Sequence, residues 1–229
     1  MVEQMTSTKI EAKNTVDPIW QAMRQDAEHW LVEETALASW LQTAVLEHNS
    51  FQTALAFLLS AKLGSSEINP LSLYQILYEP ISQDLDIIGS ARADLSATYE
   101  RDPACNSYLE PFIFYKGYQA VQAYRIAHWM WHQGRKTLAQ YIQSRVSETF
   151  QVDIHPAAKI GKGIMLDHAT GVVIGETAIL GDSVSLLHGV TLGGTGKDRG
   201  DRHPKIGTGT MIGAGAAVLG NITVGNCCR

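Results

Sequence analysis

Histidine recurs beside acidic and basic residues in the last third of this 229-residue chain, and such groups are suited to chemistry. Asp167-His168 and Arg202-His203 are two of these pairs. Neutral imidazole, with an unperturbed pKa of about 6.5, can take a proton from an alcohol and return it to a leaving group. An arginine presents a planar fork of donors that fits a carboxylate. The residue types therefore suit proton transfer close to a bound anion.

Ordinary structural roles are also open to these residues. His168 could be an exposed residue at a corner of the fold, without a catalytic role, and Asp153, earlier in the chain, could cap a strand. Arg202 could be one charge of a solvated loop, as most surface arginines are. Spacing alone does not place Asp153 against His168, so both interpretations stay open at this level.

Composition describes an ordinary globular chain, with 45% apolar residues, 18% charged residues and a net charge of −5. This charge gives no basic surface for nucleic acid. Cys105, Cys227 and Cys228 form no disulfide framework and favour a reducing compartment. The N-terminus lacks the apolar core of a signal peptide, and the longest apolar run, 54–59, is too short to span a membrane. We therefore expect a cytoplasmic protein without a membrane or nucleic-acid partner.

The two parts of the chain differ in composition, which predicts a domain boundary near residue 150. All five tryptophans precede this residue, whereas sixteen of the twenty glycines follow residue 160. Asp17-Pro18 predicts the start of a helix. One helical face follows it, formed by Trp20, Met23, Ala27 and Trp30. A second face, which ends before the expected C-cap Gly134, consists of Phe114, Tyr118, Val121, Tyr124, His128 and Trp131. The prolines expected to break the region into short helices are Pro70, Pro80, Pro103 and Pro111.

The second part repeats with a period of six, which neither helices nor plain strands have. Aliphatic residues share one six-residue register at Ile154, Ile160, Leu166, Val172, Ala178, Val184 and Val190, and the pattern resumes at Ile206, Ile212, Val218 and Val224. In a parallel β-helix each hexapeptide forms one side of a prism and three make a coil. The sequence thus predicts an α+β protein: an all-helical domain over 1–150 and a parallel β-helix over 151–229. The insertion 193–204 is expected to project as a loop.

Several motifs are similar to those of bacterial and plant serine O-acetyltransferases, a family of hexapeptide-repeat acyltransferases. These motifs are Asp167-His168-Ala169-Thr170-Gly171, Gly175-Glu176-Thr177, 191–197, Asp201-Arg202-His203-Pro204-Lys205 and, in the helical part, Arg101-Asp102-Pro103-Ala104. The likeness covers nearly the whole chain. It implies a left-handed β-helix that transfers an acetyl group from acetyl-CoA to the hydroxyl of L-serine. The products would be O-acetyl-L-serine and CoA, in the first step of cysteine biosynthesis.

The resemblance also implies roles for single residues. His168 is the general base by similarity, and Asp153 is its orienting carboxylate. Asp102, from the helical domain, and Asp167 match the family's residues for the ammonium group of serine.

For the carboxylate of serine the resemblance implies Arg202 and His203, with Glu176 in support. Close approach of CoA is expected at the small residues Gly194, Thr195, Gly213 and Ala214. Acetyl-CoA is a co-substrate in this interpretation. Neither a permanently bound cofactor nor a metal ion is expected.

Assembly and regulation are implied in the same way. The family forms trimers through the β-helix and joins two trimers through the helical domains, so we expect a hexamer. Cysteine resembles serine and is expected to act as a feedback inhibitor. The chain ends at Arg229 partway through a hexad series, a pattern that favours a truncation and leaves a natural end or a disrupted reading frame open. The tail that docks O-acetylserine sulfhydrylase would then be absent, and we do not expect that partner.

Three other functions stay open from the sequence. The first is acetyl transfer to another hydroxyl compound. The second is a trimeric β-helix carbonic anhydrase, which binds zinc through histidines; this chain lacks that family's closely set pair among His155, His168, His188 and His203. The third is a non-catalytic scaffold.

Overall fold

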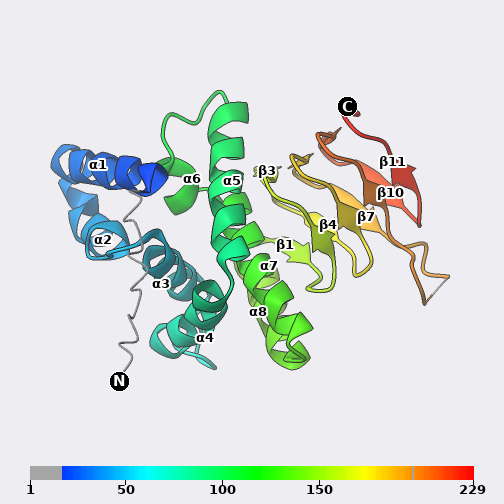
Figure 1. The fold of residues 1–229 in the computed structure, drawn as a ribbon, viewed down its shortest axis with the longest axis horizontal. Coiled ribbons are helices and arrows are strands. Elements are labelled where there is room, and N and C mark those ends of the chain that lie inside the picture. The colour runs from blue at the N-terminus through cyan, green and yellow to red at the C-terminus, as the bar shows by residue number, and fades with distance from the viewer. Residues whose placement is uncertain (1–16, 198) are drawn as a thin grey trace, which may run out of the picture.

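The computed structural model describes residues 17–197 and 199–229. Residues 1–16 of the predicted helical domain and Asp198 of the predicted loop lie outside the described residues. Figure 1 shows the helices gathered in one region and the strands stacked in the next. No helix of the described part is both long and apolar enough to cross a bilayer.

The elements follow one another in two runs. The helical run is α1 (Pro18–Glu33), η1 (Thr35–Leu37), α2 (Ala38–Leu41), η2 (Gln42–Leu46), α3 (Phe51–Leu63), α4 (Pro70–Gln83), α5 (Leu85–Arg101), α6 (Leu109–Ile113), α7 (Lys116–His132) and α8 (Lys136–Phe150). The strands are β1 (Val152–Ile154), β2 (Lys159–Ile160), β3 (Met165–Asp167), β4 (Val172–Ile174), β5 (Ile179–Leu180), β6 (Ser185–Leu187), β7 (Thr191–Gly193), β8 (Lys205–Ile206), β9 (Met211–Ile212), β10 (Ala217–Leu219) and β11 (Thr223–Val224).

The start of α1 is confirmed. Asp17 is its N-cap, and its Oδ1 accepts a hydrogen bond from the backbone N–H of Trp20 at 3.2 Å. Pro18 takes the first helical position, where a backbone N–H would have no helical partner. Met23 and Ala27 are fully buried, so the predicted face is the one that packs on the core.

Two expectations for the helices are wrong. Pro80 does not end a helix but lies inside α4, where it is buried, as Leu77 and Ile81 are, so burial of this face outweighs the missing N–H. Phe114 precedes α7 and is 51% exposed, and its ring stacks on that of Trp30 at a centroid distance of 6.1 Å instead of continuing the buried face of α7.

The strands form three sheets in which all pairs are parallel. Their orders are β1-β4-β7-β10, β2-β5-β8-β11 and β3-β6-β9, which we call the first, second and third sheets. Consecutive strands of the chain belong to different sheets, so each coil passes through all three. Val184, Leu186 and Leu192 are fully buried inside the stack. The parallel coil that the period of six predicts is confirmed.

The hexapeptide register is wrong at one corner. Ile154 pairs with Ile174, where three hexapeptides would have brought Val172 beside it, so the first coil is two residues longer than expected. The extra residues lie between β3 and β4, at the corner that carries His168, because the next coil returns to eighteen residues with Val173 opposite Thr191. Val172 and Ile174 are both buried, so a count of aliphatic positions does not reveal the shift.

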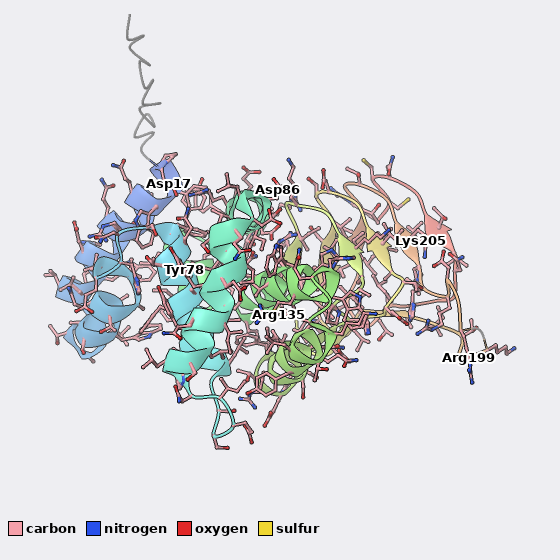
Figure 2. All side chains as sticks on the ribbon, turned by 60° about the horizontal axis from the view of Figure 1, so that its bottom comes forward. Asp17, Tyr78, Asp86, Arg135, Arg199 and Lys205 are labelled. Carbon is pink, nitrogen blue, oxygen red and sulfur yellow. The ribbon has the colours of Figure 1, made fainter. Side chains whose placement is uncertain are left out.

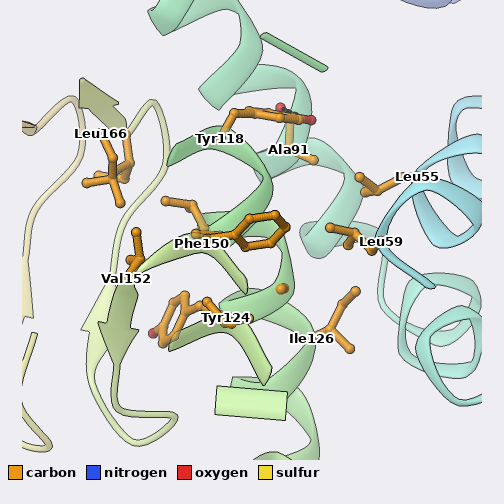
Figure 3. Close-up of a cluster of buried hydrophobic side chains, with 14 of the residues drawn as sticks. Leu55, Leu59, Ala91, Tyr118, Tyr124, Ile126, Phe150, Val152 and Leu166 are labelled. Carbon is orange, nitrogen blue, oxygen red and sulfur yellow. Dashed lines mark hydrogen bonds between the residues drawn. The ribbon is translucent and has the colours of Figure 1, made fainter. Parts of the chain in front are cut away.

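Helix α7 joins the two regions into one core. Figure 3 shows Tyr124 of α7 on the side of the strands and Ile126 on the side of α3. The Tyr124 hydroxyl donates to the carbonyl of Ala158 at 2.5 Å. Arg125, also on α7, forms a buried ion pair with Asp94 of α5 at 2.8 Å. The helices and the first coil are therefore packed as a unit.

Candidate active site

A cavity of about 480 Å³ opens between the helices and the first coil. Its walls come from the end of α5, the start of α7, and β3 with the corner that follows it. Three of the predicted site residues line it together: Asp102, Asp167 and His168. We call these three the acid–histidine group. Lys116 lines the same cavity, although no motif in the sequence marks it.

His168 stands on the exposed corner after β3. Its side chain is 76% exposed, and its Nε2 lies 3.8 Å from Oδ1 of Asp167. The backbone φ is 55° at His168 and 61° at Ala169. Residues other than glycine adopt this region at a cost of about 1–2 kcal/mol each. Such strain persists where the surrounding structure maintains it, and it gathers at functional sites.

Helix α7 contacts this corner through Gly117. A Cβ atom at this position would lie 2.1 Å from the carbonyl oxygen of Leu166 and 3.0 Å from Cβ of Ala169. Only glycine permits so close an approach. Beside it, Nζ of Lys116 lies 2.5 Å from Oγ1 of Thr170. The signal for Gly117 in the sequence was an isolated glycine within an aromatic helical stripe.

A second group of predicted residues lies on a different edge, where the first sheet turns into the second. Nη2 of Arg202 donates to Oε2 of Glu176 at 2.7 Å. This hydrogen bond lowers the pKa of the Glu176 carboxyl. The projecting loop starts from the same edge, and Figure 2 shows Arg199 at its far end. We call Glu176, Arg202 and His203 the loop group.

His203 is buried in the loop group. Its Nδ1 accepts a hydrogen bond from the backbone N–H of Thr177 at 3.1 Å. In return, Oγ1 of Thr177 accepts hydrogen bonds from the backbone N–H groups of Arg202 and His203, at 3.0 and 3.1 Å. The ring lies so close to Gly175 that a Cβ there would be 2.0 Å from Cδ2. Thr177, which sequence reasoning did not select, therefore fixes both members of the Arg202-His203 pair.

Asp153 lies in the middle of β1, beside α8. Its Oδ1 accepts a hydrogen bond from Nε2 of Gln143 at 2.7 Å. Its charge acts on His155, whose pKa is lowered mainly by burial while the charges of Glu176 and Asp153 oppose that shift. No ion pair joins Asp153 to His168 within the described residues. The pair implied by resemblance is thus not formed within one chain: Asp153 lies in β1, whereas His168 follows β3.

The small residues expected near CoA divide between the same two edges. Gly213 and Ala214 follow β9, on the edge that carries His168, and both are exposed. Gly194 and Thr195 open the projecting loop, and a Cβ at Gly194 would lie 3.2 Å from Cγ of Arg202. Each edge therefore carries a part of the predicted set.

Histidines are spread over both edges. His168 and His188 occupy the same edge on consecutive coils, with ring centroids 5.9 Å apart. Across residues 17–197 and 199–229, no group of three or more histidine, cysteine, aspartate and glutamate side chains is arranged to hold a metal ion.

The native protein should lose stability as the pH falls from about 6.5. The pKa values of His155 and His203 are lowered, chiefly by burial, and both rings use Nδ1 as an acceptor, which a protonated ring cannot do. Below their ordinary value of 6.5 the unfolded chain binds protons that the native protein does not. The free energy of unfolding therefore decreases towards acid, through the window between 6.5 and the lowered native values.

Urea unfolding at pH 7.5 and pH 5.5 measures this dependence. The double variant His155→Gln and His203→Gln should show a smaller difference between the two pH values than the wild type. An equal difference in both proteins would contradict the assignment to these two rings.

The stacked sheets and the helices that cover the first coil define a hexapeptide-repeat β-helix protein with an N-terminal helical region. The sequence family described as serine acetyltransferase, N-terminal, matches residues 19–123. Serine acetyltransferase of Escherichia coli (strain K12) is 50% identical over 207 residues, which are 90% of this chain and 76% of that protein. The chain belongs to the serine acetyltransferase family.

Further relatives are similar over most of the chain. Serine acetyltransferase 1, chloroplastic, of Arabidopsis thaliana is 53% identical over 91% of this chain, which spans 66% of that protein's length. The structure of Neisseria gonorrhoeae serine acetyltransferase in complex with serine has a TM-score of 0.87 at 50% identity, covering 93% of this chain and 90% of that one. The structure of serine acetyltransferase in complex with coenzyme A from Brucella abortus strain S19 has a TM-score of 0.91 at 47% identity, covering 93% of this chain and 85% of that one.

Proposed function

We propose that this protein transfers an acetyl group from acetyl-CoA to the hydroxyl of L-serine, giving O-acetyl-L-serine and CoA as the first step of cysteine biosynthesis. The observation that carries the proposal is the cavity in which Asp102, Asp167 and His168 meet. Two carboxylates suit an ammonium group, and an exposed imidazole suits a hydroxyl that must lose its proton. Relatives of about 50% identity, one of them in complex with serine, support this choice of acceptor.

The loop group supplies the complementary charge, but on another edge of the prism. The cation of the cavity itself, Lys116, bonds to Thr170, so we propose that the carboxylate of serine is bound by a neighbouring subunit and that the working site lies between two subunits of a trimer. The partner subunit's Arg202 and the partner subunit's His203 would bind the carboxylate. The partner subunit's Glu176, which bonds to Arg202 within each chain, would orient the guanidinium. The partner subunit's Asp153 would then face His168 and fix its tautomer. This arrangement accounts for the separation of Asp153 from His168 within one chain.

The reaction follows from these positions. His168 takes the hydroxyl proton of serine while the oxygen attacks the thioester carbonyl of acetyl-CoA. As the tetrahedral intermediate collapses, the C–S bond breaks, and the imidazolium returns the proton to the thiolate of CoA. Gly194, Thr195, Gly213 and Ala214 allow CoA to lie close to the backbone along the two edges. This chemistry needs no permanently bound cofactor and no metal.

The finer features implied by resemblance are part of the same proposal. The β-helix is left-handed, residues 1–150 and 151–229 act as the oligomerisation and acyltransferase domains, and two trimers join through the helices. Cysteine matches serine in its ammonium and carboxylate groups, so it would compete for the cavity as a feedback inhibitor. A reducing cytoplasm suits the free thiols of Cys105, Cys227 and Cys228.

Serine should be the preferred acceptor in a panel of hydroxyl compounds. Release of the CoA thiol is measured with acetyl-CoA and, in turn, L-serine, L-homoserine, 3-hydroxypropionate and a hydroxylated sugar. 3-Hydroxypropionate is the informative control, because it keeps the hydroxyl and carboxylate and lacks the ammonium group that Asp102 and Asp167 would bind. A higher kcat/KM for the sugar would instead support a hexapeptide acetyltransferase with another acceptor, and no release with any compound would support a scaffold.

A further inference from the structure

Arg101, the last residue of α5, reaches across to the β-helix. Its Nη1 lies 3.1 Å from the carbonyl oxygen of Gly163, 3.2 Å from that of Ser183 and 3.2 Å from Oγ of Ser185. Gly163 precedes β3 in the first coil, whereas Ser183 and Ser185 belong to the second. A single guanidinium therefore binds two successive coils. None of the roles described above uses this residue.

The residue that follows Arg101 belongs to the cavity. Asp102 is the C-cap of α5, and its backbone N–H donates to the carbonyl of Thr98 at 3.0 Å. Its Oδ1 accepts the N–H of Ala104 at 2.9 Å. The first bond fixes the backbone of Asp102 to the last turn of α5, and the second fixes its side chain to the turn that follows. The place of Asp102 in the cavity therefore depends on where the end of α5 sits.

The opposite wall of the cavity begins at the corner before β3, which contains Gly163. Ile164, the residue after Gly163, donates its N–H to Oδ1 of Asp94 at 2.8 Å. Asp94 is fully buried on α5, about two turns before Arg101. Helix α5 is thus attached to this corner at two points, of which Arg101 is the one nearest to the cavity. β3 leaves the corner directly towards Asp167 and His168.

We propose that Arg101 is a positioning residue for serine binding, one that holds Asp102 opposite Asp167 and His168 by fastening the end of α5 to two coils of the β-helix. The inference rests on the proposed function, since it names how one side of that site is held. Arg101 itself contacts no substrate in this proposal. All three contacts come from Nη1, so the length and direction of the arginine side chain, which bring this one nitrogen between two coils, matter more than the fork of the guanidinium.

Arg101→Ala should raise the KM for serine by about 10- to 100-fold, because small displacements of a binding group have effects of this order. The KM for acetyl-CoA and the melting temperature should stay close to those of the wild type. Arg101→Lys should recover part of the loss, because an ammonium can still donate to one or two of the acceptors. Arg92→Ala is the matched control: it lies on the same helix, pairs with Asp17 at 2.6 Å and should keep wild-type kinetics.

A double-mutant cycle with Asp102→Asn tests the route of the effect. If Arg101 acts through Asp102, the double variant has the same serine KM as Asp102→Asn alone, and both single variants lose the preference for serine over 3-hydroxypropionate. Effects that multiply in the double variant, or an unchanged serine KM in Arg101→Ala, would overturn the proposal. A wild-type protein that releases no thiol with serine would instead overturn the proposed function, and the inference with it.

Discussion

Replacing His168 with alanine lowers the turnover of acetyl-CoA with serine by about 10²- to 10⁴-fold, the loss expected when a general base is removed. The imidazole is 76% exposed at the mouth of the cavity, so its removal leaves no buried gap. The folded state should therefore survive, and the melting temperature should change little. The measurement is thiol release at saturating substrates, together with thermal unfolding of the variant.

His188→Ala is the matched control for this variant. His188 is an exposed histidine on the same edge, one coil further along, and its ring is 5.9 Å from that of His168. Loss of a nearby imidazole that does not line the cavity should leave most of the activity. Near-normal turnover in a folded His168→Ala protein would remove His168 from the mechanism.

Mixing two inactive variants should restore activity, because the two halves of the site lie on different edges of one chain. His168→Ala damages the acid–histidine group, and Arg202→Ala damages the loop group. When either variant assembles alone, every active site of its trimer carries the same defect. Random co-assembly in equal amounts brings an intact cavity against an intact partner loop at about one site in four, so about a quarter of the wild-type activity returns.

The experiment uses co-expression of the two variants with different affinity tags, so that purification on both tags isolates mixed assemblies, and light scattering shows that these have the size of a trimer or its dimer. A control mixture of His168→Ala with Asp167→Asn should stay inactive, since both changes fall in the same half. If the mixture of His168→Ala with Arg202→Ala also stays inactive although mixed trimers form, each site is complete within one subunit. A monomer at micromolar concentration would contradict the trimer itself.

Much of the fold could be predicted because local physical rules dominate it. Asp17 and Pro18 start α1 through an N-cap and a missing N–H, which depend on neighbouring residues alone. The period of six needs only the geometry of a coil. Pro80 escaped prediction because burial of its helix face outweighs a local backbone defect, and burial is a property of the whole molecule.

The site was harder to predict from the sequence because it depends on which edge of the prism each residue occupies. The motifs named Asp167, His168, Arg202 and His203, yet nothing in their spacing assigned them to two edges. Gly117 and Arg101 act through contacts with segments far away in the chain, and although Arg101 opens one of the motifs, nothing in the motif indicates which segments it contacts. Such positioning residues become visible only once the helices are packed against the coil.

The two additional residues at the corner of His168 have a consequence for protein design. A solenoid built from an averaged hexapeptide would have a regular corner here, with six residues per side and no residue other than glycine at positive φ. Such a chain should be the more stable coil, since it sheds the strain at His168 and Ala169. Without the two additional residues, the imidazole would also lie closer to the surface of the β-helix and farther from Asp102. Grafting this activity onto another repeat scaffold therefore requires copying an irregularity, because the regular repeat alone has no place for it.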